Sequence, residues 1–179
     1  TTEIYTLSLH DALPIYQRRA HIRILYDEFS KELSVRRGYS QQLLFPEYID
    51  LMPEDLPFFE QIKDDMRVLG FDTELNAGPQ LVVKGMPSRL RSPEQVMALL
   101  NDMLYRVKNA YGDSTEKIRE EIALSLSESS AIPSVGRLSA EEMANMVDQL
   151  FACPMHYYTP DGKTVMVIIT QDELANRFN

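Results

Sequence analysis

Apolar residues recur at helical spacing in the first part of the chain. Between Gln17 and Leu33 they fall at i, i+3, i+4, i+7 and i+11, the period of a helix with one buried face; they are Ile22, Leu25, Tyr26, Phe29 and Leu33. The same spacing predicts a helix over Glu54–Leu69 that stops at Gly70. Serine N-caps predict three more helices, and a short one closes the chain; the caps are Ser92, Ser114 and Ser139, and the last helix covers Gln171–Phe178.

Four shorter runs have the composition of strands. They are rich in β-branched and other apolar residues and are bounded by turn residues; they cover Gln42–Leu51, Phe71–Leu75, Gln80–Lys84 and Thr164–Thr170. Pro46 lies inside the first run. Because proline has no backbone N–H, it confines that part of the run to a sheet edge or a bulge. Short strands mixed with helices give an α+β fold, or an α/β fold with one sheet.

The first fifteen residues stand apart from this pattern. They read TTEIYTLSLHDALPI, which resembles, nearly word for word, a translated sequencing-library adapter joined to a truncated gene. We therefore treat residues 1–16 as a foreign segment, with Tyr16 at the join, and exclude it from fold reasoning. The alternative is a real strand, because Ile4, Thr6 and Ser8 alternate with larger apolar residues.

Composition limits the class of protein. Hydrophobic residues make up 44% of the chain, which is enough for one domain, or for one domain with a small satellite. No apolar run approaches the roughly 20 residues that span a bilayer, so we expect no membrane association. The single Cys153 rules out an internal disulfide and suits a reducing cytoplasm. A formal net charge of −9 argues against a dedicated nucleic-acid-binding surface.

Several short sequences occur in the order and at the intervals of one known family. They are Gln17–Phe29, Gln41–Pro46, Val83–Pro87, Leu138–Met143 and Phe151–Pro154. Together they resemble the C-terminal dimerisation domain of the MutL family, the matchmakers of DNA mismatch repair. The closing Thr159–Lys163 looks like the Bacteroidetes-type members of that family.

The resemblance implies a two-lobed α+β fold and a homodimer. Residues 17–86 and 133–179 would form a dimerisation lobe with a mixed sheet, and residues 87–132 a smaller external lobe. The domain would join two N-terminal ATPase domains, which use ATP and magnesium and lie outside this sequence. The mismatch recognition protein MutS and DNA would be engaged mainly through the full-length protein. The chain contains no Gly-rich phosphate loop, so no cofactor is expected in this fragment.

Gln41–Pro46 is the strongest candidate binding segment. In the MutL family a Gln-x-x-Leu-x-Pro sequence at this place docks on the replication sliding clamp; here the six residues are Gln41, Gln42, Leu43, Leu44, Phe45 and Pro46. A glutamine amide can hydrogen-bond at the mouth of an apolar pocket, apolar side chains supply buried area, and proline lowers the entropy of the extended form. The alternative is a plain edge strand whose apolar residues face the core. The two interpretations are compatible, because one segment can pair at a sheet edge and also bind the clamp.

Many members of the family are metal-dependent endonucleases, and this chain departs from their ligand pattern. The family places an Asp, a His and two Glu on the first helix, with Cys and His ligands in two later segments. The matching positions here hold Tyr16, Arg18, Ile22, Asp27 and Glu128, while the last motif keeps Cys153 and displaces its histidine to His156. We therefore expect no catalytic residue, no bound metal and a domain that is not an enzyme.

Two other hypotheses remain open. A nicking endonuclease with a repositioned site would use Asp27, Cys153 and His156 as weak candidate metal ligands. A free-standing adaptor unrelated to repair would require a fold without the two-lobed order. The stripe of Met143, Met146 and Phe151 on one predicted helix favours a core or a dimer interface.

Overall fold

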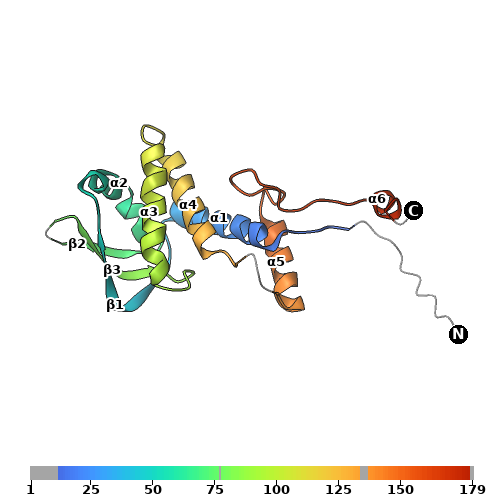
Figure 1. The fold of residues 1–179 in the computed structure, drawn as a ribbon, viewed down its shortest axis with the longest axis horizontal. Coiled ribbons are helices and arrows are strands. Elements are labelled where there is room, and N and C mark those ends of the chain that lie inside the picture. The colour runs from blue at the N-terminus through green and yellow to red at the C-terminus, as the bar shows by residue number, and fades with distance from the viewer. Residues whose placement is uncertain (1–11, 77, 134–136, 178–179) are drawn as a thin grey trace.

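The computed structural model describes residues 12–76, 78–133 and 137–177. Within these ranges six α-helices, one short 3-10 helix and three strands are defined (Figure 1). In chain order they are α1 (Gln17–Val35), β1 (Ser40–Asp50), η1 (Pro53–Asp55), α2 (Leu56–Val68), β2 (Asp72–Leu75), β3 (Gln80–Pro87), α3 (Glu94–Asn109), α4 (Thr115–Ser130), α5 (Ala140–Ala152) and α6 (Gln171–Ala175). The predicted α+β fold is confirmed.

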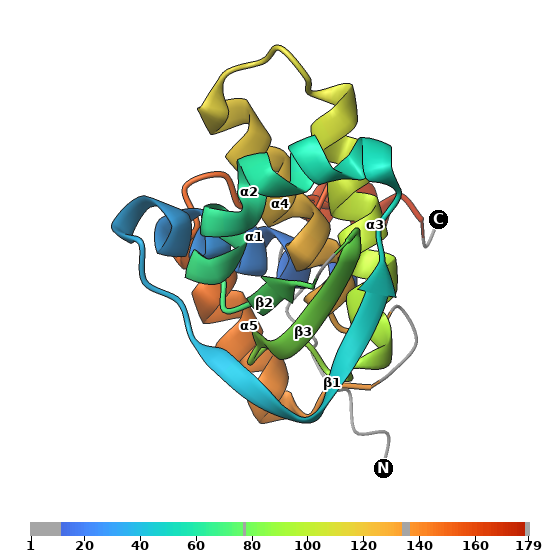
Figure 2. The same ribbon diagram turned by 90° about the vertical axis from the view of Figure 1, so that its left-hand side faces the viewer.

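The three strands form one sheet in the order β1-β3-β2. β3 runs antiparallel to both neighbours, which leaves β1 and β2 at the two edges. The sheet is therefore antiparallel, not mixed as the resemblance implies. The physical reason is that β2 and β3 join through a tight turn, whereas a parallel neighbour would need a crossover of a dozen or more residues. Helices lie behind one face of the sheet (Figure 2).

Two of the three predicted serine N-caps form in the structure. The Ser114 hydroxyl accepts a hydrogen bond from the Lys117 backbone N–H, and Ser139 forms a reciprocal capping box with Glu142. Ser92 makes no cap, because α3 begins one residue later with Pro93 as its N-cap. The Ser92 side chain instead bonds the Glu94 carboxyl and lowers its pKa.

Thr164–Thr170, which the sequence predicts as the clearest strand, forms only isolated bridges within the described residues. Thr164 bridges to Tyr158, Met166 to Ile15, and Ile169 to Ala12. Pro14 lies in the middle of the partner segment and has no N–H to donate, so the pairing cannot run as a continuous ladder. The foreign origin of residues 1–16 stays a prediction, and residues 1–11 lie outside the described part. The last predicted helix ends at Ala175, and Phe178 also lies outside the described residues.

Two hydrophobic clusters divide the chain differently from the lobes that the resemblance implies. The larger cluster takes side chains from Ile22 to Ala131. The smaller one consists of Ala20, Ile24, Leu150, Cys153, Val165 and Met166. Residues 87–132 thus share a core with the sheet instead of forming a separate unit. The cause is the apolar faces of α3 and α4, which are buried on the same core as β3.

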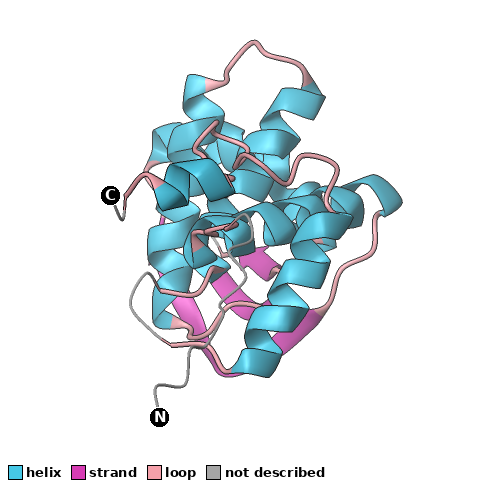
Figure 3. Ribbon diagram, turned by 90° about the vertical axis from the view of Figure 1, so that its right-hand side faces the viewer, coloured by secondary structure: helices cyan, strands magenta, loops and turns pink. Residues whose placement is uncertain are grey.

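α1 contributes to both clusters and so connects the two parts of the molecule. In Figure 1 the sheet lies at one end, α1 runs through the middle, and α5 and α6 lie toward the other end. Figure 3 views the molecule from the end that carries α6. The sheet and the C-terminal segment are therefore far apart, and they offer two separate surfaces.

Replacing Phe29 with alanine is expected to lower the free energy of unfolding by about 3–5 kcal/mol. Phe29 is almost fully buried in the larger cluster, where α1 packs with the sheet and helices. Urea denaturation should show a lower midpoint with an unchanged slope. The exposed Met97→Ala variant is the control. A loss below about 1 kcal/mol for Phe29→Ala would contradict a shared core.

Candidate functional site

Within the segment Gln41–Pro46, residues 43–46 form a bulge in the edge strand β1, while Gln41 and Gln42 stay paired with β3. Gln42 pairs with Gly85 and Glu47 pairs with Val83, so four residues on β1 face one residue, Lys84, on β3. These four residues, three more than regular pairing would place opposite Lys84, leave the ladder at the sheet edge. The prediction that Pro46 confines this part to an edge or a bulge is confirmed.

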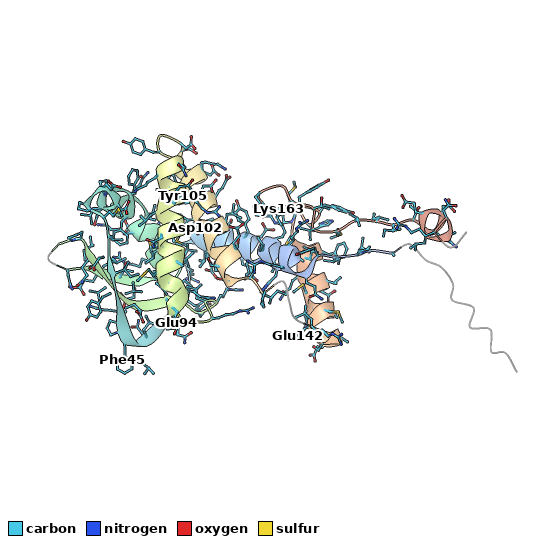
Figure 4. All side chains as sticks on the ribbon, in the orientation of Figure 1. Phe45, Glu94, Asp102, Tyr105, Glu142 and Lys163 are labelled. Carbon is cyan, nitrogen blue, oxygen red and sulfur yellow. The ribbon has the colours of Figure 1, made fainter. Side chains whose placement is uncertain are left out.

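The bulge separates its apolar side chains into an outward and an inward group. Leu44 is 95% exposed and Phe45 is 81% exposed, whereas Leu43 is half-buried and packs against the larger cluster. Figure 4 shows Phe45 at the foot of the sheet, pointing away from the helices. Of Leu43, Leu44 and Phe45, only Leu43 therefore faces the core, as the alternative of a plain edge strand requires. Two adjacent large apolar side chains, Leu44 and Phe45, are thus exposed together at the sheet edge.

Arg18, at the family's histidine position, is engaged in structural hydrogen bonds. Its guanidinium donates to the backbone oxygens of Ile132 and Glu128, each at 2.8 Å, and of Ala131 at 3.3 Å. His21, one turn along α1, accepts a hydrogen bond from the Ile132 N–H at its Nδ1 atom, at 3.0 Å. Burial, reinforced by nearby arginines, lowers the pKa of His21. These contacts tie α1 to the end of α4.

The other nuclease positions are also occupied by structural contacts. Ile22 is buried in the larger cluster. The Glu128 carboxylate accepts a hydrogen bond from Arg106 Nη2 at 2.6 Å. Asp27 forms an ion pair with Arg23, one turn earlier on α1. Each of these side chains has a partner or a packing role that does not involve a metal.

The three weak candidate metal ligands are Asp27, Cys153 and His156, and the structure does not bring all three together. Asp27 lies near the Cys153 thiol, where its charge acts on the thiol pKa. The His156 ring packs between Phe151 and Tyr157, and its Nδ1 lies 3.1 Å from the Cys153 carbonyl oxygen. Across residues 12–76, 78–133 and 137–177, no group of three or more His, Cys, Asp or Glu side chains could hold a metal ion. No described helix is long and apolar enough to cross a membrane.

A groove of about 210 Å³ lies between α5 and the segment that precedes α1. Its lining is almost entirely apolar: Leu13, Ile15, Gln17, Leu138, Met143, Met146, Val147 and Leu150. The Val167 N–H donates to the Pro14 oxygen at 3.2 Å, so Val167 and its neighbour Ile168 lie beside this groove. Both are about half exposed, and Met143 is 44% exposed. The groove and the segment that pairs with one of its walls thus both carry exposed apolar side chains.

Comparison with known proteins assigns the fold to a family. The model of the MutL C terminal dimerisation domain matches residues 10–138. The chain belongs to the MutL family of DNA mismatch repair proteins. It is 37% identical to DNA mismatch repair protein MutL of Bacteroides fragilis over 164 residues, which are 92% of this chain and 26% of that protein. The protein of the same name from Parabacteroides distasonis is 35% identical over 172 residues, 96% of this chain and 28% of that protein.

A third relative, DNA mismatch repair protein MutL of Chlorobaculum tepidum, is 36% identical over 165 residues, 92% of this chain and 26% of that protein. The chain spans about a quarter of the length of the curated relatives it matches. It therefore corresponds to the dimerisation part of MutL.

Two features of this MutL domain escape the sequence analysis. Asp72 and Gly85 lie at the base of the bulge, and Val167 lies beside the groove. Gly85 carries a usable signal, because a glycine inside an apolar strand marks close approach of another chain segment. Nothing in the sequence around Val167 distinguishes a surface position from a core position, because the whole run from Val165 to Ile169 is apolar.

The Cys153 thiol of this MutL domain is expected to resist Ellman's reagent at about pH 8. Burial, aided by the nearby Asp27 carboxylate, raises the pKa of the thiol to about 12. The reactive thiolate is then scarce, and the side chain is only 7% exposed. Absorbance should rise only after urea is added, which is also the control for thiol content. Stoichiometric reaction within minutes in native buffer would contradict the buried position.

Proposed function

We propose that this domain dimerises a mismatch repair MutL protein and binds the replication sliding clamp through the bulge, without nuclease activity of its own. The observation that carries the clamp contact is the outward position of Leu44 and Phe45 at a sheet edge. The family model and the relatives support the dimerising role.

The chemistry of the bulge suits a small apolar pocket with a polar rim. Leu44 and Phe45 would each remove apolar surface from water, at roughly 25 cal/mol per Å². The Gln41 amide, which is exposed, can both donate and accept hydrogen bonds at the pocket mouth. A single short segment buries less area than a standard interface, so we expect weak binding, on the order of 10 μM.

Titration of the domain with a purified bacterial sliding clamp tests the clamp contact. NMR resonances of residues 41–46 should shift in a saturable manner, while resonances of α5 should not. Binding too weak to detect at about 200 μM clamp would contradict the proposal.

We place the contact between two copies at the apolar groove and at the residues beside it. A stable dimer buries about 1,200–2,000 Å², and a two-fold axis brings the same patch of both chains together. The exposed Met143, Val167 and Ile168 lie in or beside the groove and would be covered in such a dimer. This end of the molecule is far from the bulge, so dimerisation leaves the clamp contact free (Figure 1).

The proposal that the domain is not a nuclease predicts no tight metal binding. Manganese or zinc should be removed by dialysis, and nicking of supercoiled DNA should stay at the buffer level even with clamp present. The reason is that the family's His and first Glu positions hold Arg18 and Ile22, which have no metal-ligating atom, and that Glu128, at the Cys position, is paired with Arg106. A MutL domain that carries the full ligand pattern is the positive control. Zinc that stays bound stoichiometrically after dialysis would favour the nuclease alternative.

The name of the relatives, DNA mismatch repair protein MutL, supports a wider role. We propose that the dimer holds two N-terminal ATPase domains close enough to act together around DNA in the cytoplasm. ATP and magnesium would be bound there, and DNA and the mismatch recognition protein MutS would be engaged mainly by the full-length protein. The formal charge of −9 agrees with a domain that leaves DNA binding to other parts.

A further inference from the structure

The base of the bulge is held by polar side chains that close over a glycine. Gly85 is buried, while Asp72 and Gln42 on the two strands beside it are exposed. A Cβ atom at position 85 would lie 2.6 Å from Ser40 Oγ, 3.1 Å from Asp72 Cβ and 3.3 Å from Gln42 Nε2. A Cβ atom there would displace the Ser40 hydroxyl and press on Asp72 and Gln42, so glycine lets β1 and β2 place these groups over β3 without rearrangement.

The two glutamines of the segment differ in their partners. Gln42 Nε2 donates to Asp72 Oδ2 at 3.4 Å, across the sheet from one edge strand to the other. The Gln41 backbone is paired with Met86 in the ladder, but its side chain has no hydrogen-bond or ion-pair partner among the residues that the structure describes. Gln42 is therefore part of the base, and Gln41 is the glutamine that is free to bind another protein.

We propose that the sheet preorganises the bulge for the clamp, with Gly85 and Asp72 as positioning residues and with Gln41, Leu44 and Phe45 as the residues that touch the partner. The inference rests on the proposed clamp contact. Leu43, packed against the core, fixes the bulge from beneath. Holding a binding segment in its bound form raises affinity because less conformational freedom is lost on binding.

A set of variants tests this inference with the clamp as the probe. In Gly85→Val the branched side chain displaces Ser40 and Gln42, and we expect about tenfold weaker clamp binding, because only about a tenth of the molecules would keep the competent bulge. Asp72→Ala removes the Gln42 partner, and we expect an affinity loss of about threefold. Gln80→Ala, which removes a 2.9 Å hydrogen bond to Asp50 at the other end of the sheet, is the matched control and should bind like the parent.

A free peptide of residues 39–48 gives an independent measurement. It carries the contacting residues without the sheet, and we expect it to bind the clamp about tenfold more weakly than the intact domain. If Gly85→Val does not fold, judged by its thermal unfolding, the double variant Gln42→Ala/Asp72→Ala replaces it, because both side chains are exposed.

The outcomes separate this inference from the clamp contact itself. If Leu44→Ala/Phe45→Ala binds like the parent, the clamp contact fails. If that variant loses binding while the folded base variants and the free peptide bind as tightly as the parent domain, the contact stands and the preorganisation is overturned. Weaker binding by both the base variants and the peptide supports the inference.

Discussion

Replacing Met143 and Val167 with glutamate is expected to turn the dimer of this MutL domain into monomers. Both side chains are about half exposed in the single chain, one in the groove and one beside it, so a charge there leaves the fold of the monomer intact. In the dimer the same carboxylates would be buried without partners, at a cost of several kcal/mol. Since about 1.4 kcal/mol is a factor of ten, the dimer dissociation constant should rise at least about 100-fold.

Sedimentation velocity over a range of concentrations measures this change. The matched control is Met97→Glu/Tyr105→Glu, which charges two exposed side chains of α3 far from the groove. The control should remain dimeric, and both variants should unfold at nearly the parent temperature. A Met143→Glu/Val167→Glu protein that stays dimeric would place the contact on another surface.

The variant Leu44→Ala/Phe45→Ala is expected to lose clamp binding by about 100-fold or more. Full burial of a leucine or phenylalanine side chain contributes about 1.5–3 kcal/mol each, and both are removed here. The loss should leave stability nearly unchanged, because neither side chain belongs to either hydrophobic cluster. The clamp titration by NMR or by surface immobilisation gives the affinity, and thermal unfolding checks the fold.

The control for this experiment truncates two exposed large side chains elsewhere on the molecule. Met97→Ala/Tyr105→Ala does so on α3, and it should bind the clamp like the parent. An equal loss of affinity in both double variants would point to a general surface effect. An affinity within twofold of the parent for Leu44→Ala/Phe45→Ala would make the segment a plain edge strand.

The sequence predicts the bulge because its cause is local. Pro46 has no N–H for the ladder, and that property depends on no other residue. Which side chains point outward could not be predicted in the same way. It depends on the four-against-one register with β3, at whose base Gly85, Asp72 and Gln42 meet across three strands. The orientation of Leu44 thus depends on tertiary contacts. The presence of the motif, in contrast, can be recognised from the sequence alone.

The division of the buried residues into two clusters could not be predicted from the sequence either, because it also depends on tertiary contacts. The apolar periods of α3 and α4 predict helices with one buried face, and both helices form. Periodicity does not say what covers that face. In the structure it is the core that also contains β3 and α1, so no break between hydrophobic clusters falls at residue 87, and the lobe boundaries stay a prediction. The substitutions at Arg18 and Ile22 are visible in the sequence, but their hydrogen bonds and packing are not.

Sedimentation equilibrium of the unmodified domain, alone and with sliding clamp, tests dimerisation and clamp binding together. We predict twice the 20.6 kDa chain mass for the domain alone. We also predict a heavier complex when clamp is added at concentrations near the dissociation constant, on the order of 10 μM. A single-chain mass at all concentrations up to about 100 μM, or a dimer whose mass clamp does not change, would contradict this prediction.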